Sequence, residues 1–269
     1  PGIFTATGHG GDGTYTYQWY DGGGSVGGAT ASTYAPGNLT VSNSYHCSVT
    51  SGSCGTVSTS STSIIVDGDL SATIAGGNSP ICYNSAPGTF TARGLGGTGS
   101  YTYQWYNNSG AVGGATASSY APGNITADNA YYCAVTSGSC GTVNTSTTSI
   151  SVDAALAATI SGGTTPICYN TDPGAFTATG SGGTGSYTYQ WYNGAGSIGG
   201  ATSSTYDPGN LVASNSYHCS VTSGTCGTVN TGSTAITVDA NLTATISGGT
   251  TPICYNASPG TFTATGHGG

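Results

Sequence analysis

The sequence predicts an all-β protein in which one β-sandwich domain of 86 residues is repeated in tandem. Two strings, YTYQWY and PICYN, recur with almost no substitutions. They begin at Tyr15, Tyr101 and Tyr187, and at Pro80, Pro166 and Pro252. Successive copies are 86 residues apart (101 − 15 and 166 − 80). A solenoid coil or propeller blade has roughly 20–50 residues, so each unit is expected to have a core of its own.

This period divides the 269 residues into four segments. The first repeat (1–67) is partial and lacks the first strand, the second (68–153) and third (154–239) repeats are complete, and the C-terminal segment (240–269) starts a fourth. Pro1 and Pro259 have the same phase, since 259 − 1 is three times 86. We therefore expect the chain to be a window on a longer periodic protein.

The composition excludes several classes of partner. Lys and Glu are absent, Arg93 is the one strong base, and the net charge is −8. Nucleic acids and anionic membranes bind basic patches, so neither is an expected partner. No apolar run approaches the ~20 residues that span a bilayer. A nearly neutral surface of Ser, Thr, Asn, Gly and Tyr suits association with other copies of itself or with adjacent repeats.

Short β-rich runs separated by turn residues place the strands, most clearly in the second repeat. Tyr101–Tyr106 alternates so that Trp105 points into the core. The loop 94–100 is rich in glycine and is expected to be a turn. The other predicted strands are Leu70–Ile74, Thr89–Arg93, Ala111–Ala115, Ser119–Tyr120, Tyr131–Thr136 and Thr147–Val152.

A tryptophan in the third strand and a later Tyr-x-Cys resemble the immunoglobulin pattern, in which the tyrosine occupies the tyrosine corner. The predicted core residues of the three repeats are Trp19, Trp105, Trp191, Tyr45, Tyr131 and Tyr217. One departure is that the second strand carries Phe90 and Ala92 where the immunoglobulin disulfide needs a cysteine.

The run QWY, followed by GGATASSYAPGN and YYCAVTSGSCGTV, resembles the bacterial Ig-like repeats of large Bacteroidota surface proteins. The resemblance covers essentially every repeat. That family includes adhesins exported by the type IX system, some linked to gliding. The resemblance implies a secreted, extracellular protein at the cell surface.

Each repeat period carries three cysteines, and the nine are Cys47, Cys54, Cys82, Cys133, Cys140, Cys168, Cys219, Cys226 and Cys254. A secreted compartment oxidises accessible pairs, but three cysteines cannot all pair within one domain. The bacterial resemblance favours Cys82–Cys140. Cys82–Cys133 is the rival, and a third option joins Cys82 to the Cys140 equivalent of the neighbouring repeat. A leftover Cys133 is expected to be a buried, inert thiol.

Metal sites and cofactors are not expected. His46 and His218 flank cysteines, but Tyr132 occupies the same position in the second repeat, so these residues are not predicted zinc ligands. Asp67, Asp153 and Asp239 lie at repeat boundaries, with Asp69 beside the first. Calcium at these joints needs ~6–8 oxygen ligands, so the aspartates are interpreted as turn formers.

No catalytic constellation is visible, and the chain is predicted not to be an enzyme. His9 and His267 lie in glycine loops without a recurring acidic partner. A glycosidase needs two carboxylates, and nine Asp with no Glu make such a pair hard to build in one repeat.

These observations predict a structural or adhesive component of an extracellular cell-surface fibre or filament. One alternative is a multivalent carbohydrate-binding array, with surface glycans as partners of exposed Tyr83, Tyr106 and Tyr132. The interpretation preferred for these tyrosines is packing on sheet faces. Another alternative is a non-catalytic appendage of a larger secreted enzyme.

Overall fold

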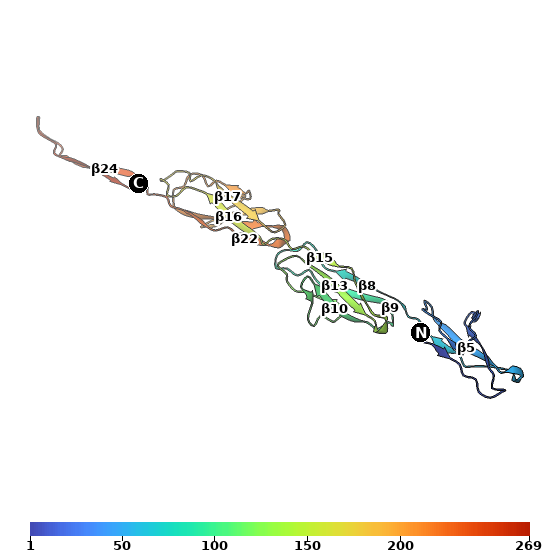
Figure 1. Ribbon diagram of the computed structural model, residues 1–269. Coiled ribbons are helices and arrows are strands. Elements are labelled where there is room, and N and C mark those ends of the chain that lie inside the picture. Colours follow the sequence, from blue (N-terminus) through green and yellow to red (C-terminus); the bar gives the residue numbers. More distant parts are fainter. The chain divides into compact units, whose positions relative to one another are not determined.

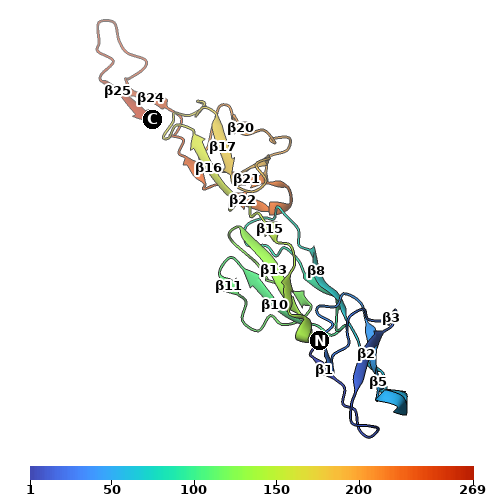
Figure 2. The same cartoon turned by 45° about the vertical axis from the view of Figure 1, so that its right-hand side comes forward.

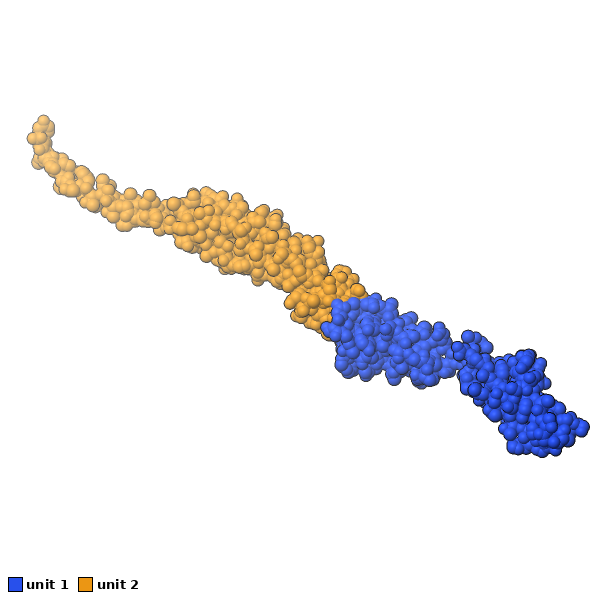
Figure 3. Space-filling view, in the orientation of Figure 1, with its two compact units in different colours: residues 1–76, 90–120, 130–148 blue, residues 77–89, 121–129, 149–269 orange.

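A computed structural model describes all 269 residues, and almost every regular element in it is a β-strand. The chain divides into two compact units. They are residues 1–76, 90–120 and 130–148, and residues 77–89, 121–129 and 149–269 (Figure 3). The first repeat belongs to the first unit. The third repeat and the C-terminal segment belong to the second.

The third repeat shows the complete domain within one unit. Its strands are β16 (Ala157–Gly162), β17 (Phe176–Ser181), β18 (Thr188–Asn193), β19 (Gly196–Ser197), β20 (Thr205–Tyr206), β21 (Asn215–Thr222), β22 (Thr228–Asn230) and β23 (Thr234–Ile236). One sheet has the order β16-β17-β20 (Figure 2). The other has the order β19-β18-β21-β22, with β23 paired to β21. Every strand pairing within these two sheets is antiparallel. The two sheets form the predicted immunoglobulin-like sandwich.

The core of the third repeat lies between these sheets. Trp191 lies opposite Cys219 in the β18–β21 pairing, and both side chains are fully buried. Alternation along β21 also directs Tyr217 and Val221 inward. The indole Nε1 of Trp191 donates a hydrogen bond to the carbonyl of Ser203 at 2.9 Å. The core tryptophan therefore loses no hydrogen bond on burial.

The second repeat has the same strands. They are β8 (Gly68–Gly76), β9 (Phe90–Gly97), β10 (Thr102–Asn107), β11 (Gly110–Ala111), β12 (Ser119–Tyr120), β13 (Asn129–Thr136), β14 (Thr142–Asn144) and β15 (Thr148–Ile150). Trp105 and Tyr131 are buried, and Phe90 contacts both rings.

Two predicted boundaries in the second repeat were wrong. The glycines at 94–97 continue β9 because they pair with β8, from Gly68 opposite Gly97 to Gly76 opposite Phe90. The predicted strand Ala111–Ala115 shrinks to β11. The chain turns there through Gly114, whose φ of 75° is one that glycine adopts without steric cost.

The first repeat contains β1 (Phe4–Thr5), β2 (Thr16–Asp21), β3 (Gly24–Ser25), β4 (Thr33–Tyr34), β5 (Asn43–Thr50), β6 (Thr56–Ser58) and β7 (Thr62–Ile64) (Figure 1). Trp19 and Tyr45 are buried here. Its larger sheet has the order β3-β2-β5-β6, with β7 on β5. The smaller sheet is only β1-β4, because no strand occupies the position of β8 or β16.

The C-terminal segment is a two-stranded hairpin of β24 (Thr243–Gly248) and β25 (Phe262–His267). All residues of both strands are exposed. The helical elements of the protein are three single turns, η1 (Gly52–Cys54), η2 (Gly138–Cys140) and η3 (Gly224–Cys226). None is long and apolar enough to cross a bilayer.

Candidate functional site

A disulfide between Cys82 and Cys226 joins the second repeat to the third. Its Cα atoms are 5.2 Å apart, and 144 positions separate the two cysteines in sequence. Both residues belong to the second compact unit. Cys226 lies 86 residues after Cys140 and is therefore its equivalent in the third repeat. The observed disulfide is thus the third predicted option, in which Cys82 bonds to the neighbouring repeat.

The loop that carries Cys82 is fixed to the end of the second repeat. Ile81 donates its N–H to the carbonyl of Ser151 at 3.0 Å and accepts a hydrogen bond from the N–H of Asp153 at 2.8 Å. Ser79 Oγ accepts a further bond from the Ser151 N–H at 2.9 Å. These bonds hold Cys82 beside the linker into the third repeat.

The turn that carries Cys226 is fixed to the start of the third repeat. Ser223 is fully buried, and its Oγ accepts a hydrogen bond from the N–H of Thr184. Its carbonyl accepts one from the N–H of Cys226, and its own N–H donates to the carbonyl of Gly227. Gly183 donates its N–H to the carbonyl of Ala154 at 2.8 Å. The turn η3 is therefore held beside the residues that enter β16.

This geometry corrects the predicted pairing of Cys82 with Cys140 or Cys133. The third repeat gives the physical reason through its equivalent cysteines, Cys168 and Cys226. Cys226 lies at the end of β16 where the repeat begins, whereas Cys168 follows the other end. Six strand residues separate these ends by roughly 20 Å, whereas bonded cysteines have Cα atoms within about 7 Å. Each complete repeat thus carries its two accessible cysteines at opposite ends.

The third cysteine of each repeat faces the core. Cys47, Cys133 and Cys219 are buried and have no disulfide partner. Burial raises the pKa of each of these thiols above the ordinary value. They remain protonated and pack as small apolar side chains.

In each complete repeat, the aspartate just before the repeat begins lies beside the cysteine of the single helical turn, which is Cys140 in η2 or Cys226 in η3. Asp153 Oδ2 lies 3.9 Å from Cys226 Sγ. Asp67 Oδ2 accepts a weak hydrogen bond from the free Cys140 thiol at 3.7 Å. Burial, together with the negative charge of Asp67, raises the pKa of Cys140. Asp67 and Asp153 therefore each adjoin a sulfur atom, which calcium does not select as a ligand.

The residues flanking the buried cysteines form pairs on the outer face of the larger sheet. Tyr106 stacks on Tyr132 with ring centroids 4.8 Å apart. In the first and third repeats a histidine takes the same place, since Tyr20 stacks on His46 and Tyr192 on His218. A planar ring is the shared requirement, which explains why tyrosine and histidine interchange there.

One group of three potential metal ligands exists, formed by Cys82, Asp153 and Cys226. Its two sulfur atoms are already bonded to each other. Sequence reasoning placed Asp153 at a repeat boundary, but it ranked the bond of Cys82 to the neighbouring repeat last among three options. The repeat of 86 residues was the signal that could have found it, because a bond from the Cys82 position of one repeat to the Cys140 position of the next can recur along the chain.

Comparisons with known proteins match a family model and a set of solved structures. The family, described as a domain of unknown function (DUF8696), matches residues 1–68, 71–154 and 156–240. No curated protein matches.

Two of the similar structures contain three domains each. Extracellular domains 3–5 of Drosophila OTK share 13% identity, with a TM-score of 0.38, over 83% of this chain and 85% of that one. The three N-terminal domains of the bacteriophage RB49 highly immunogenic outer capsid protein share 13% identity, with a TM-score of 0.37, over 88% and 92%.

Proposed function

We propose that this chain, which belongs to the DUF8696 family and carries its domain three times in tandem, has a structural role in an extracellular fibre at the cell surface. The Cys82–Cys226 disulfide is the observation that carries this proposal. The bond stabilises a joint between two domains, which a monomeric binding domain or an enzyme domain does not require. The resemblance to Bacteroidota surface repeats supports a bacterial, adhesin-like setting.

The disulfide changes the covalent path along which the chain transmits force. A pull on the two ends passes from Cys82 directly to Cys226, so residues 83–225 bear no tension through their backbone. The third-repeat strands β16, β17, β18 and β21 lie inside this bypassed stretch. Opening their sandwich under load therefore cannot lengthen the protein while the bond is intact.

The chemistry of this bond supports an extracellular location. Disulfides persist in oxidising compartments and are rare in the cytosol. The chain-entropy model gives a loop of this length a stabilisation of about 5 kcal/mol. Peptide mapping of native material without reductant checks this, because free thiols at both Cys82 and Cys226 would contradict the location.

Force spectroscopy on residues 1–269, held at its two ends, tests the mechanical role. In the oxidised protein, only residues outside 83–225 are expected to extend. Reductant should release an additional contour length of up to roughly 500 Å, at about 3.3–3.6 Å per residue. Cys226→Ser should show that extra length without reductant, and the exposed Cys54→Ser serves as the matched control. Equal extension before and after reduction would refute the role.

A glycan-binding array is the second candidate, and one observation favours it. Tyr83 and Tyr169 lie at equal phase in neighbouring repeats, and both are exposed. Exposed aromatic rings at a fixed spacing suit multivalent stacking on sugars. Binding on a glycan array that disappears in the Tyr83→Ala, Tyr169→Ala double variant would support this function in place of the structural one.

A further inference from the structure

The Cys82–Cys226 disulfide lies beside a carboxylate group. The Oδ2 atom of Asp153 is 3.9 Å from Cys226 Sγ. Both sulfur atoms and a carboxylate oxygen of Asp153 lie within 4.8 Å of one another, and all three side chains are half-buried. The third repeat contains no lysine or arginine to neutralise the carboxylate. A negative charge therefore lies against both sulfur atoms of the bond.

Backbone hydrogen bonds fix the position of Asp153 on both sides. Its own N–H donates to the carbonyl of Ile81 at 2.8 Å, and Ile81 directly precedes Cys82. The carbonyl of the next residue, Ala154, accepts a hydrogen bond from the N–H of Gly183 at 2.8 Å. Asp153 is thus held between the loop of the second repeat and the start of the third.

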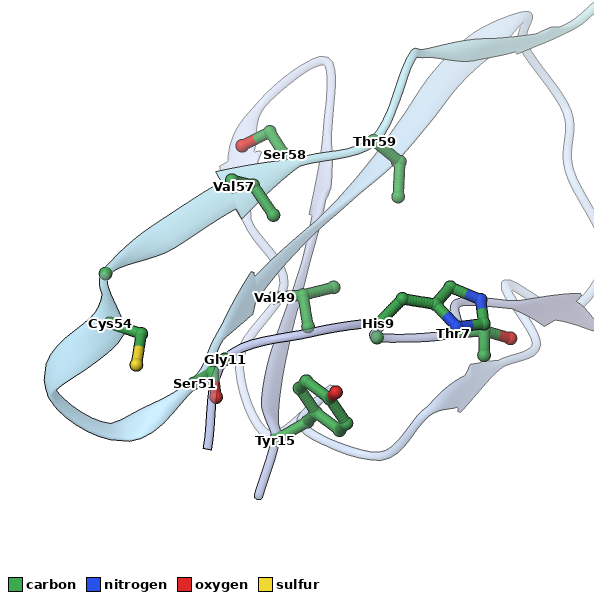
Figure 4. Close-up of a pocket in the computed structure, with 12 residues that line it drawn as sticks. Thr7, His9, Gly11, Tyr15, Val49, Ser51, Cys54, Val57, Ser58 and Thr59 are labelled. Carbon is green, nitrogen blue, oxygen red and sulfur yellow. The ribbon is translucent and has the colours of Figure 1, made fainter. Parts of the chain in front are cut away.

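The turn that carries the second cysteine is packed tightly against the same framework. A Cβ built on Gly183 would lie 2.6 Å from the Oγ of Ser223, so only glycine allows this approach. The first repeat makes the same contact between Gly11 and Ser51, beside the turn that carries Cys54 (Figure 4). The cysteine turn is therefore a fixed part of the repeat, and it keeps its sulfur at a constant distance from the aspartate.

The carboxylate beside the cysteine turn is a property of the repeat. In the second repeat, Asp67 Oδ2 lies 3.7 Å from Cys140 Sγ, as Asp153 Oδ2 lies 3.9 Å from Cys226 Sγ. Asp239 follows Asp153 by 86 residues and has the same place in the sequence. We therefore expect the charge to recur at each joint that has this disulfide.

A cavity of about 410 Å³ gives access to one of the two sulfur atoms. The residues that line it include Cys82, Asp153, Thr184 and Thr225, whereas Cys226 does not line it. A reagent that enters the cavity therefore meets the Cys82 sulfur and the Asp153 carboxylate together.

Reduction of this bond proceeds by thiol–disulfide exchange. A thiolate attacks Cys82 Sγ, the bond between the two sulfur atoms breaks, and Cys226 leaves as a thiolate that takes a proton from water. A second thiol molecule then resolves the mixed disulfide. Two reductant molecules are thereby oxidised to one disulfide, while Cys82 and Cys226 are reduced to thiols. During the first step, negative charge develops on the Cys226 sulfur, next to Asp153.

We propose that Asp153 makes the joint disulfide selective among thiol reductants. Glutathione carries more carboxylate than ammonium groups, so its thiolate is repelled by Asp153. Cysteamine has an ammonium group that balances the charge of its thiolate, so it is not repelled. Two unit charges about 4 Å apart in water change a rate by about fivefold. The joint therefore resists anionic thiols and is opened by a thiol partner without net negative charge.

This selectivity decides which reductants return tension to the backbone of residues 83–225. It rests on the proposed function for its biological purpose, since it concerns the regulation of the same disulfide. Rates of thiol exchange are measured without force, so a failure of the selectivity is distinguishable from a failure of the mechanical role.

Reduction of residues 1–269 by glutathione and by cysteamine, at one pH and at low ionic strength, tests the proposal. Alkylation with iodoacetamide followed by peptide mapping measures how much Cys82–Cys226 bond remains at each time. In Asp153→Asn, reduction by glutathione should accelerate about fivefold, while reduction by cysteamine should change little. Equal acceleration by the two thiols, or no acceleration by glutathione, would overturn the proposal.

The matched control is Asp207→Asn, which removes an exposed carboxylate. Asp207 follows β20, and β20 pairs with β17 at Phe176, at the end of the third repeat away from Cys226. Asparagine keeps the side-chain oxygen that accepts the N–H of Gly209. Both reduction rates should equal those of the wild type. Acceleration of reduction by glutathione in this variant would assign the effect to net charge and overturn the role of Asp153.

Salt and the site of attack provide two further measurements. At roughly 1 M salt the Debye length falls to about 3 Å, so the difference between wild type and Asp153→Asn with glutathione should shrink. Early in the reaction, glutathione should be attached to Cys82. A difference that did not shrink with salt, or glutathione attached to Cys226 instead, would contradict the proposed path of attack.

Discussion

The first and third repeats have closely similar sequences from YTYQWY onward, yet they bury the same positions to different extents. Val57 is 73% exposed, whereas its equivalent Val229 is half-buried. Thr59 is exposed, whereas Thr231 is 6% exposed. The difference is the strand β16 and its following loop, which cover these positions in the third repeat. A single strand thus decides whether one edge of the sandwich is closed to water.

The largest expected effect comes from removing the strand that distinguishes the two repeats. Ile160→Asp, in β16, places a charge against the third-repeat core and should lower its stability by roughly 2–4 kcal/mol. Hydrogen exchange measured by mass spectrometry reports each repeat separately. In the wild type, amides of β5 should exchange faster than those of β21, and the substitution should bring the two rates together.

The control for this comparison is Ala157→Asp, at an exposed residue of the same strand. It should leave exchange of β21 nearly unchanged. If β5 and β21 exchanged equally in the wild type, the open edge of the first repeat would have no energetic consequence, and the comparison would fail.

A smaller effect is expected at the buried serine that holds the cysteine turn. Ser223→Ala removes the acceptor of a part-buried hydrogen bond from the Thr184 N–H and should cost about 0.5–1.5 kcal/mol. Denaturant unfolding with reductant present measures this without the contribution of the disulfide. Ser161→Ala, at an exposed residue, should cost far less. Equal costs for the two variants would show that the buried hydrogen bond is not important.

The smallest expected effect is a loss of stability at acidic pH that is specific to the first repeat. Asp12 occupies the place of Thr184, and hydrogen bonds from the Thr14 N–H and the Ser51 hydroxyl lower the pKa of its carboxyl group. A lowered folded-state pKa gives stability that is present above the unfolded value, near pH 4, and is lost as the pH falls through the folded value.

Exchange of β5 should therefore accelerate below about pH 4 relative to exchange of β21, after correction for the intrinsic rates. Asp12→Thr copies the third repeat and should remove this difference. If β5 still exchanged faster at acidic pH in Asp12→Thr, a titratable group other than Asp12 would be responsible.

Much of the fold was predictable from the sequence because its signals are local. The period of 86 residues, the alternation around Trp105 and the Tyr-x-Cys pattern led to the all-β tandem sandwich that the structure confirms. The predicted strand ends at Arg93 and Ala115 were wrong, because cross-strand pairing decides where a glycine-rich strand ends, and pairing partners are distant in sequence.

The candidate site was less predictable. The sequence identified the accessible cysteines and located their neighbouring aspartates at the repeat boundaries, but residue types do not reveal which loops share an end of a sandwich. The strand β16 sets that arrangement, since its length carries Cys168 away from Cys226 and leaves each cysteine facing a neighbouring repeat.

By itself, then, the sequence determined the repeating unit, the residues of its core and the absence of basic patches, since these depend on composition and on spacing along the chain. Only the tertiary structure decided that Cys82 bonds to Cys226 and that Cys168 and Cys226 lie at opposite ends of the third repeat. Both depend on distances across the folded domain, which the order of residues along the chain does not state.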